Sequence, residues 1–412
     1  MGCMEIDLIK RVIQSQREEI GYNLLQVKER DGLQEAAKFL KFPNVLAITG
    51  VRRCGKSIFS LLVAQNIAKN YGYLNFFDER LIGFKAEDFE KLEQAFLELI
   101  GEPDLIILDE VQEVPGCELF VSRLRRTKKV IITGSNSTLL SGELSTYLTG
   151  RHLDITLWPY SFSEKIGSKP NTFSIREIAE TRKKYQAYLQ EGGFPEVEKF
   201  GKEIIKIIYQ DIINKDCLRR YTIREEEAFR RLSHYLLSNY SSEFTYSKLS
   251  KILEIKDQHT VANYVGYLKD SFLLLVLERY SPKLKQQIIA PKKVYAADHA
   301  LGNFVGFGVS RNIGRIFENI VLVELVRRKK EVYYYKDHQQ REVDFVVKEG
   351  KVKQLIQVCY DITNIKTKER ELDGLTRASR QLRCNDLLVI TNDYESIEGK
   401  VRFIPLWKWL LQ

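Results

Sequence analysis

The strongest chemical signal in the sequence is the run of residues 50–57, Gly-Val-Arg-Arg-Cys-Gly-Lys-Ser. It matches the pattern G-x-x-x-x-G-K-S, with an apolar run before it and a helical run after it. Such a loop wraps its backbone N–H groups around phosphate oxygens, while Lys56 reaches the β- and γ-phosphates and the Ser57 hydroxyl binds Mg²⁺. We therefore predict an ATP site. The residues expected to contact ATP are Gly50, Val51, Arg52, Arg53, Cys54, Gly55, Lys56, Ser57 and Ile58.

Two carboxylates at the end of an apolar run form a second candidate feature. Residues 105–108 are followed directly by Asp109 and Glu110, about 50 positions after the loop. Alone, such a pair is often an ordinary strand end. Together with the loop it is the Walker B arrangement, in which Asp109 holds Mg²⁺ and Glu110 orients and polarises the water that attacks the γ-phosphate.

A third apolar run, residues 130–133, also ends in polar residues. In a parallel sheet these residues emerge at the carboxyl edge, where the phosphates of a bound nucleotide lie. Ser135 or Asn136 could therefore sense the γ-phosphate. The alternative is a turn that caps the following helix, and both roles are compatible.

The elements that must position these residues are predicted from hydrophobic patterning. The apolar runs at 45–49, 73–77, 105–108 and 130–133 alternate with helical stretches, which predicts a parallel sheet covered by helices on both faces. The fold class is thus α/β, a P-loop NTPase sheet. We expect four parts: an ATPase core at 1–160, a helical lid at 161–224, a winged helix-turn-helix at 225–299 and a second α/β domain at 300–412.

Several stretches together resemble a prokaryotic AAA+ superfamily of ATPases. They are residues 48–57, 74–81, 108–112 and 133–137, with 147–151 and 192–196 similar to the family's later landmarks. The resemblance implies that the ATPase is followed by a winged helix and a C-terminal domain like restriction endonucleases. It also implies that Arg151 is an arginine finger, acting on a neighbouring subunit or on its own site. A surface arginine in a turn is the alternative.

The same resemblance marks a nuclease-like site that departs from the family pattern. The matching metal-site positions are Glu318, Asp344 and Gln357, but Cys359 stands where a restriction-type nuclease has its lysine. We therefore expect a catalytically degenerate domain unless Lys351 or Lys353 reaches the site.

Charge and composition limit the partners. Apolar residues make up 44% of the chain and charged residues 29%, as in folded globular proteins. The net charge is +9, and the excess of basic residues lies entirely in the C-terminal half. Residues 1–200 have a net charge of −1 and residues 201–412 a net charge of +10. The six cysteines and five histidines show neither disulfide nor zinc spacing, and the longest apolar run is too short to span a bilayer. We expect a soluble cytoplasmic protein with no membrane contact.

The basic C-terminal half suggests DNA as a partner, with a protein partner or a homo-oligomer as further possibilities. The winged helix would present its third helix and its wing to DNA through Gln258, His259, Asn263, Tyr267, Lys269, Lys283, Lys285, Lys292 and Lys293. A purely structural role for this module is equally compatible with the sequence.

These observations predict Mg²⁺-dependent binding and hydrolysis of ATP, coupled to domain rearrangement and acting on DNA. Two alternatives remain open. One is a nucleotide-gated switch that docks a protein or DNA, and the other is a DNA nuclease regulated by ATP.

Overall fold

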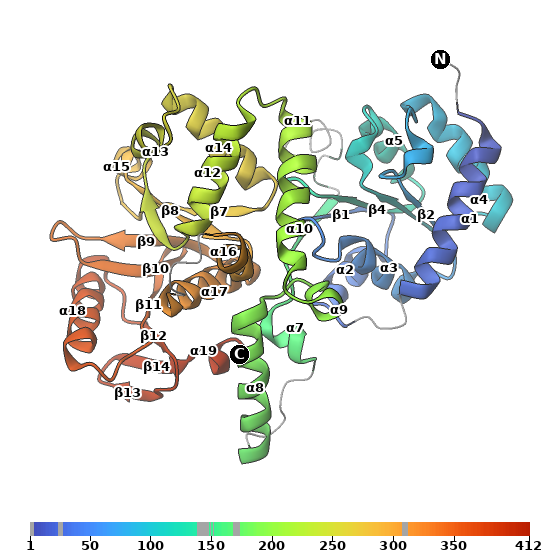
Figure 1. The fold of residues 1–412 in the computed structure, drawn as a ribbon. Coiled ribbons are helices and arrows are strands. Elements are labelled where there is room, and N and C mark those ends of the chain that lie inside the picture. Colours follow the sequence, from blue (N-terminus) through green and yellow to red (C-terminus); the bar gives the residue numbers. More distant parts are fainter. Residues whose placement is uncertain are drawn as a thin grey trace. The chain divides into compact units, whose positions relative to one another are not determined.

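A computed structural model describes residues 4–23, 28–137, 148, 150, 152–167, 174–306 and 312–412 (Figure 1). The chain divides into two compact units, residues 1–158 and 159–412. Among the residues described, no helix has the length and apolar character needed to cross a membrane.

The first unit contains a five-stranded parallel sheet with the strand order β2-β3-β4-β1-β5. Its strands are β1 (Val45–Gly50), β2 (Tyr71–Asn75), β3 (Leu105–Asp109), β4 (Lys129–Gly134) and β5 (His152–Leu157). The predicted parallel sheet is confirmed, and its four predicted strands are present. The sequence analysis missed β5, an edge strand in which polar His152, Asp154 and Thr156 alternate with apolar residues.

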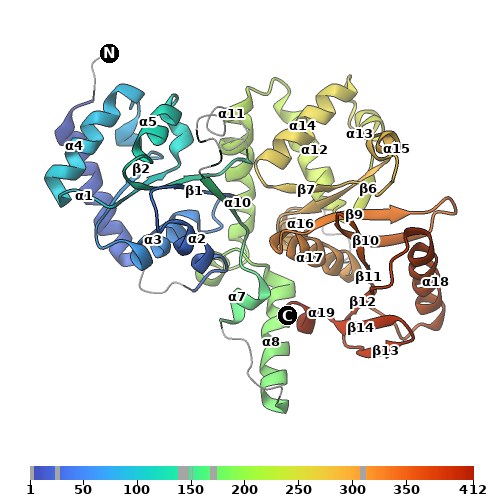
Figure 2. The same cartoon turned by 180° about the vertical axis from the view of Figure 1, so that it is seen from behind.

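Helices cover both faces of this sheet, as expected for strands that are apolar throughout (Figures 1 and 2). They are α1 (Ile6–Asn23), α2 (Leu33–Phe39), α3 (Lys56–Ile67), α4 (Phe89–Ile100) and α5 (Cys117–Leu124). Val45 and Ala47 of β1 share a core with α1, α4 and α5. Leu46 and Ile48 alternate with them and therefore face the opposite side, where α3 packs on β1, β3 and β4.

The second unit begins with helices and a small antiparallel sheet of order β6-β8-β7. Its helices are α7 (Phe162–Ile166), α8 (Ile175–Glu191), α9 (Val197–Phe200), α10 (Ile204–Asp211), α11 (Arg219–Tyr221), α12 (Glu226–Ser238), α13 (Tyr246–Leu253), α14 (Gln258–Asp270), α15 (Leu284–Ile289) and α16 (His299–Val305). The strands are β6 (Ser242–Phe244), β7 (Leu274–Leu277) and β8 (Lys292–Ala296). Helices α12, α13 and α14 and the β7–β8 pair are elements that a winged helix-turn-helix requires, and the identification of this region as a winged helix stays a prediction.

The C-terminal block forms a six-stranded mixed sheet with the order β13-β14-β12-β11-β10-β9. Its strands are β9 (Glu331–Lys336), β10 (Glu342–Glu349), β11 (Lys351–Val358), β12 (Leu387–Thr391), β13 (Ser396–Glu398) and β14 (Val401–Pro405). Helix α17 (Ile313–Arg327) precedes the sheet, α18 (Ile365–Leu382) connects β11 to the parallel strand β12, and α19 (Leu406–Trp409) ends the chain. A second α/β region is therefore present, as predicted, although β13 and β14 were not foreseen.

A hydrophobic core cluster joins helices and strands from several parts of the second unit. Tyr185 of α8, Tyr295 of β8, Phe317 of α17 and Phe345 of β10 belong to the same cluster of buried residues. The predicted domain boundaries at 224 and 299 fall inside this compact unit, and they stay predictions.

The segment at residues 192–196, one of the stretches similar to the AAA+ family, is held by two hydrogen bonds within the second unit. Gly193 accepts a backbone hydrogen bond from Tyr160 at 2.7 Å, and its own N–H donates to the Asp298 carboxylate at 2.8 Å. A Cβ atom on Gly193 would lie 2.1 Å from the Tyr160 carbonyl oxygen. Glycine is therefore required there by close backbone approach.

Candidate nucleotide-binding site

The loop between β1 and α3 has the backbone shape that its sequence predicts. Gly50 has a φ of 144°, and a Cβ atom there would lie 2.0 Å from the Leu157 carbonyl oxygen of β5. Gly55, with a φ of 97°, immediately precedes the first residue of α3. Residues with side chains rarely adopt these backbone conformations. The two glycines therefore let the loop turn tightly and lead into the N-terminus of α3, a helix of twelve residues.

Lys56 and Ser57 open this helix and lie where the pattern requires them. The Lys56 side chain is buried, and its ammonium donates to the carbonyl oxygens of Gly50 at 3.1 Å and Val51 at 3.3 Å. A positive charge is thus held inside the curve of the loop. Ser57 lies close enough to Asp109 for its side chain to oppose the effect of burial on the pKa of that carboxyl, so the two predicted Mg²⁺ ligands are near each other.

Asp109 is completely buried at the end of β3. Its carboxylate accepts hydrogen bonds from the Tyr73 hydroxyl at 2.6 Å and from the Thr133 hydroxyl. Burial, together with the nearby Glu110 carboxylate, raises the pKa of Asp109 above its usual value. A buried carboxylate of this kind is stabilised by a cation, and this is the character of a metal ligand.

Thr133 connects the two acids. Its hydroxyl donates to Asp109 and accepts the backbone N–H of Glu110 at 2.9 Å. Glu110 has a positive φ of 53°, and its carboxylate accepts a hydrogen bond from the Gln112 amide. The backbone turn directs Glu110 away from the strand in which Asp109 lies. Two adjacent carboxylates thereby have different surroundings, one fully buried and one partly exposed.

Arg30 is a site residue that sequence reasoning missed. Its guanidinium is buried and donates to the Cys54 carbonyl oxygen at 2.8 Å and to the Trp158 carbonyl oxygen at 2.6 Å. Cys54 in turn donates through its thiol to the Leu157 carbonyl oxygen at 3.2 Å. Arg30 therefore joins the phosphate-binding loop to the end of the first unit. Its partners are 24 and 128 positions away in the chain, so no local sequence pattern indicates its role.

The other predicted nucleotide contacts have more varied positions. Ser135 and Asn136 are fully buried just after β4, at the same sheet edge as Asp109. The Arg52 guanidinium lies over the Phe77 ring, 5.1 Å from its centre, and Arg53 has a left-handed φ of 64°. Arg151 lies outside the described residues, and its role as an arginine finger stays a prediction.

The donor set fits MgATP. Among the described residues there is no group of three His, Cys, Asp or Glu side chains able to hold a metal ion. Mg²⁺ in phosphate-transfer sites does not need one, because it is held by one or two protein ligands together with the phosphates and water. Ser57 and the buried Asp109 provide that pair beside the loop.

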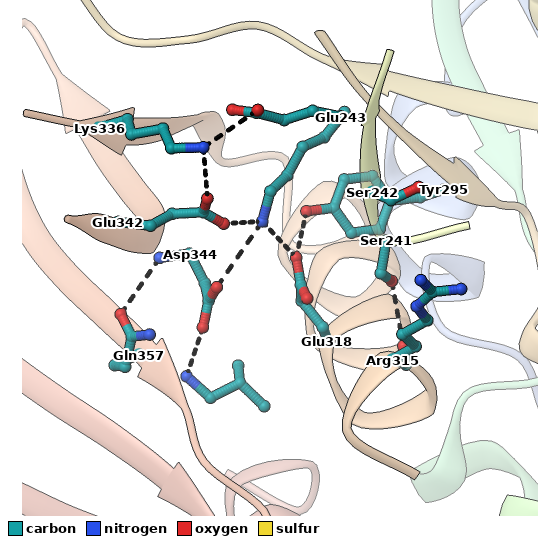
Figure 3. Close-up of polar contacts among 12 residues, drawn as sticks. Ser241, Ser242, Glu243, Tyr295, Arg315, Glu318, Lys336, Glu342, Asp344 and Gln357 are labelled. Carbon is teal, nitrogen blue, oxygen red and sulfur yellow. Dashed lines mark hydrogen bonds and ion pairs between the residues drawn. The ribbon is translucent and has the colours of Figure 1, made fainter. Parts of the chain in front are cut away.

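The three nuclease-like positions also meet in the second unit. Asp344 lies on β10 and Gln357 on β11, where the Gln357 side-chain oxygen accepts the Asp344 backbone N–H at 3.3 Å, and Glu318 lies nearby on α17 (Figure 3). Lys351 and Lys353 are both exposed near the far end of β11. Lys353 is four positions and Lys351 six positions from Gln357 along an extended strand, so the idea that either lysine completes the site is wrong.

Two further side chains at this place differ from expectation. Burial raises the pKa of the Cys359 thiol to about 11, so cysteine brings no charge to the position of the missing lysine. Lys293, predicted to lie on the exposed wing, is only 3% exposed, and that prediction is wrong. It lies on β8 facing the acidic residues.

Comparison with known proteins supports the ATP-binding interpretation. A family described as an AAA domain matches residues 43–166, and two domains of unknown function, DUF8612 and DUF4143, match residues 182–311 and 313–409. The uncharacterized protein MJ1544 of Methanocaldococcus jannaschii is 32% identical over 418 residues, which cover 94% of this chain and 93% of that protein.

The chain belongs to the same family as MJ1544. Its AAA domain places it among the prokaryotic P-loop ATPases. An uncharacterized protein of Haemophilus influenzae is 29% identical over 94% of this chain and 99% of that protein. Among solved structures, the Walker-type ATPase paby2304 of Pyrococcus abyssi matches 68% of this chain and 98% of its own chain, at 14% identity and a TM-score of 0.44.

Replacing Arg30 with methionine should weaken ATP binding about tenfold, because the loop loses two hydrogen bonds from a charged donor. Fluorescence titration with a labelled ATP analogue measures the affinity. Arg126→Met, at an exposed position of the same unit, is the matched control and should leave affinity unchanged. Equal affinity in the two variants would contradict the role given to Arg30.

Proposed function

We propose that the protein hydrolyses ATP in the first unit with Mg²⁺ as cofactor. The observation that carries the proposal is the shared position of Thr133 between Asp109 and Glu110, beside the loop that holds Lys56. When bound, Mg²⁺ would neutralise charge on the phosphates and would be held by Ser57 and Asp109. Lys56 would bind the phosphate oxygens.

Glu110 is the residue we assign to the attacking water. A general base needs a carboxylate that water can reach, whereas the neighbouring metal ligand must stay fixed. The Thr133 hydroxyl anchors the Asp109 carboxylate but binds only the backbone of Glu110. The Glu110 carboxylate is partly exposed and is oriented by the Gln112 amide. Ser135, Asn136 and Arg151 are the further residues we propose to contact the γ-phosphate.

Nucleotide turnover would be coupled to movement of the second unit. Arg30 supports this proposal, because it binds both the Cys54 carbonyl of the loop and the Trp158 carbonyl at the last residue of the first unit. A change in the loop on nucleotide binding therefore has a direct polar connection to the boundary between the units. The nucleotide-gated switch remains an alternative, in which hydrolysis is slow and only sets the lifetime of one state.

DNA is the partner we propose for the region around α14. Gln258, His259, Asn263 and Lys269 are exposed on this helix, as predicted for a helix that contacts DNA. Lys283 and Lys285 are exposed in the segment between β7 and β8. Tyr267 differs from the prediction, because its ring stacks on Tyr221 with 4.0 Å between ring centres.

Replacing Glu110 with glutamine should reduce steady-state ATP turnover about 100-fold or more while ATP still binds, because the amide cannot accept the proton of the attacking water. A phosphate-release assay and a binding titration on the same preparation give the two numbers. Glu113→Gln, three residues along the chain, is the control. Turnover that survives in Glu110→Gln would remove Glu110 from the mechanism.

Duplex DNA should bind at low salt and weaken steeply as salt rises, because contacts between lysines and phosphates release counterions. Fluorescence anisotropy of a labelled duplex measures this affinity. The double variant Lys283→Glu/Lys285→Glu should bind several-fold more weakly than Lys38→Glu/Lys41→Glu, a lysine pair of the first unit. If no binding is seen even at low salt, the DNA proposal fails and a protein partner takes its place.

A further inference from the structure

Buried Lys293 contacts three acidic residues of the second unit, of which Asp344 is buried and Glu318 and Glu342 are partly buried. Figure 3 shows these acids converging from α17 and β10. Its ammonium nitrogen is 2.8 Å from a Glu318 carboxylate oxygen and 3.7 Å from an Asp344 oxygen, and it also contacts Glu342. The lysine comes from β8, Glu318 from α17, and the other two acids from β10. One cation thus joins three separate elements.

The remaining polar groups around the cluster are also paired. The Tyr295 hydroxyl donates to Glu318 at 2.7 Å, and the Val358 N–H donates to Asp344 at 2.8 Å. Lys336 lies 3.6 Å from Glu342 and 3.0 Å from Glu243. The side chains of this network are packed so that Lys293 faces acids from α17 and β10 and the ring of Tyr334 at 5.6 Å.

Burying several carboxylates is costly unless a cation accompanies them. A divalent metal could supply that charge, but it requires oxygen ligands at 2.0 to about 2.6 Å. Here the carboxylates are spaced around an ammonium group, and the described residues contain no cluster able to hold a metal. Burial lowers the pKa of Lys293, but Tyr295 and the surrounding carboxylates outweigh it, so that its pKa lies well above the usual value.

We propose that the Lys293 ammonium takes the place of a divalent metal in this cluster and links β8 to α17 and β10. The inference does not depend on ATP hydrolysis in the first unit. The contact joins two matched domains, because Lys293 belongs to the one at 182–311 and the three acids that it contacts belong to the one at 313–409.

The proposal has a consequence for the nuclease alternative. A metal-dependent phosphodiesterase needs its cation exchangeable and open to substrate. Lys293 is covalently part of the chain and buried, and Cys359 supplies no second charge. The cluster therefore has a structural role, and the wild-type protein has no divalent-metal site there.

Thermal unfolding of the full-length protein tests this role. Lys293→Met should lower the melting temperature by about 5 °C or more, because it leaves the buried Asp344 and the largely buried Glu318 without a cation. Lys292→Met is the matched control on the same strand, where the ammonium pairs with the half-exposed Glu278 at 3.1 Å, and it should have little effect. Equal melting temperatures in the two variants would overturn the proposal.

A triple variant keeps the test valid if Lys293→Met does not fold. Adding Glu318→Gln and Asp344→Asn removes the uncompensated charges and should restore most of the lost melting temperature. If the triple variant is no more stable than Lys293→Met alone, charge compensation is not the role of Lys293.

Mn²⁺ provides the second measurement. Wild-type melting should be the same with millimolar MnCl₂ as with EDTA, and supercoiled DNA should remain uncut. A stabilisation by Mn²⁺ that disappears in Asp344→Asn would overturn the proposal by revealing a metal site. So would Mn²⁺-dependent DNA cleavage that disappears in the same variant.

Discussion

The nucleotide site depends on one hydroxyl group, that of Thr133. Strand β4 lies between β1 and β3, so the loop that follows β1 and the acids that follow β3 are separated by a single strand. The register pairs Leu108 with Ile132, which places Thr133 beside Asp109. Its hydroxyl can then bind the Asp109 carboxylate and the Glu110 backbone at once. The polar ends of three strands thereby become one site.

Buried cations play a similar part in the two units. Arg30 holds two backbone carbonyls near the nucleotide loop, and Lys293 holds three carboxylates in the C-terminal cluster. In both places a charged side chain from a distant segment satisfies groups that would otherwise be costly to bury. The resulting contacts are specific in direction, so each fixes one arrangement of the backbone around it.

The sequence predicts the nucleotide loop and four of the five strands of the first sheet because each depends on a local pattern. The residues at 50–57 determine the backbone shape of the loop locally, and buried parallel strands are apolar throughout. Short edge strands such as β13 have no such signal. The roles of Arg30 and Thr133 depend on partners far away in sequence or across a strand register. Lys293 shows the limit most clearly: in a strand, a shift of one residue exchanges the exposed and buried faces, and the basic pair Lys292 and Lys293 does not reveal which lysine points inward.

The central claim is that the loop at residues 50–57 binds the phosphates of ATP through Lys56. Isothermal titration calorimetry with MgATP tests it most directly, on the wild type and on Lys56→Ala, with matched thermal unfolding to show that both are folded. We predict one ATP bound per wild-type chain and no measurable heat in the variant, because the variant lacks the ammonium that the loop holds in place. Equal ATP affinity in the two proteins, or no binding by the wild type, would contradict the account.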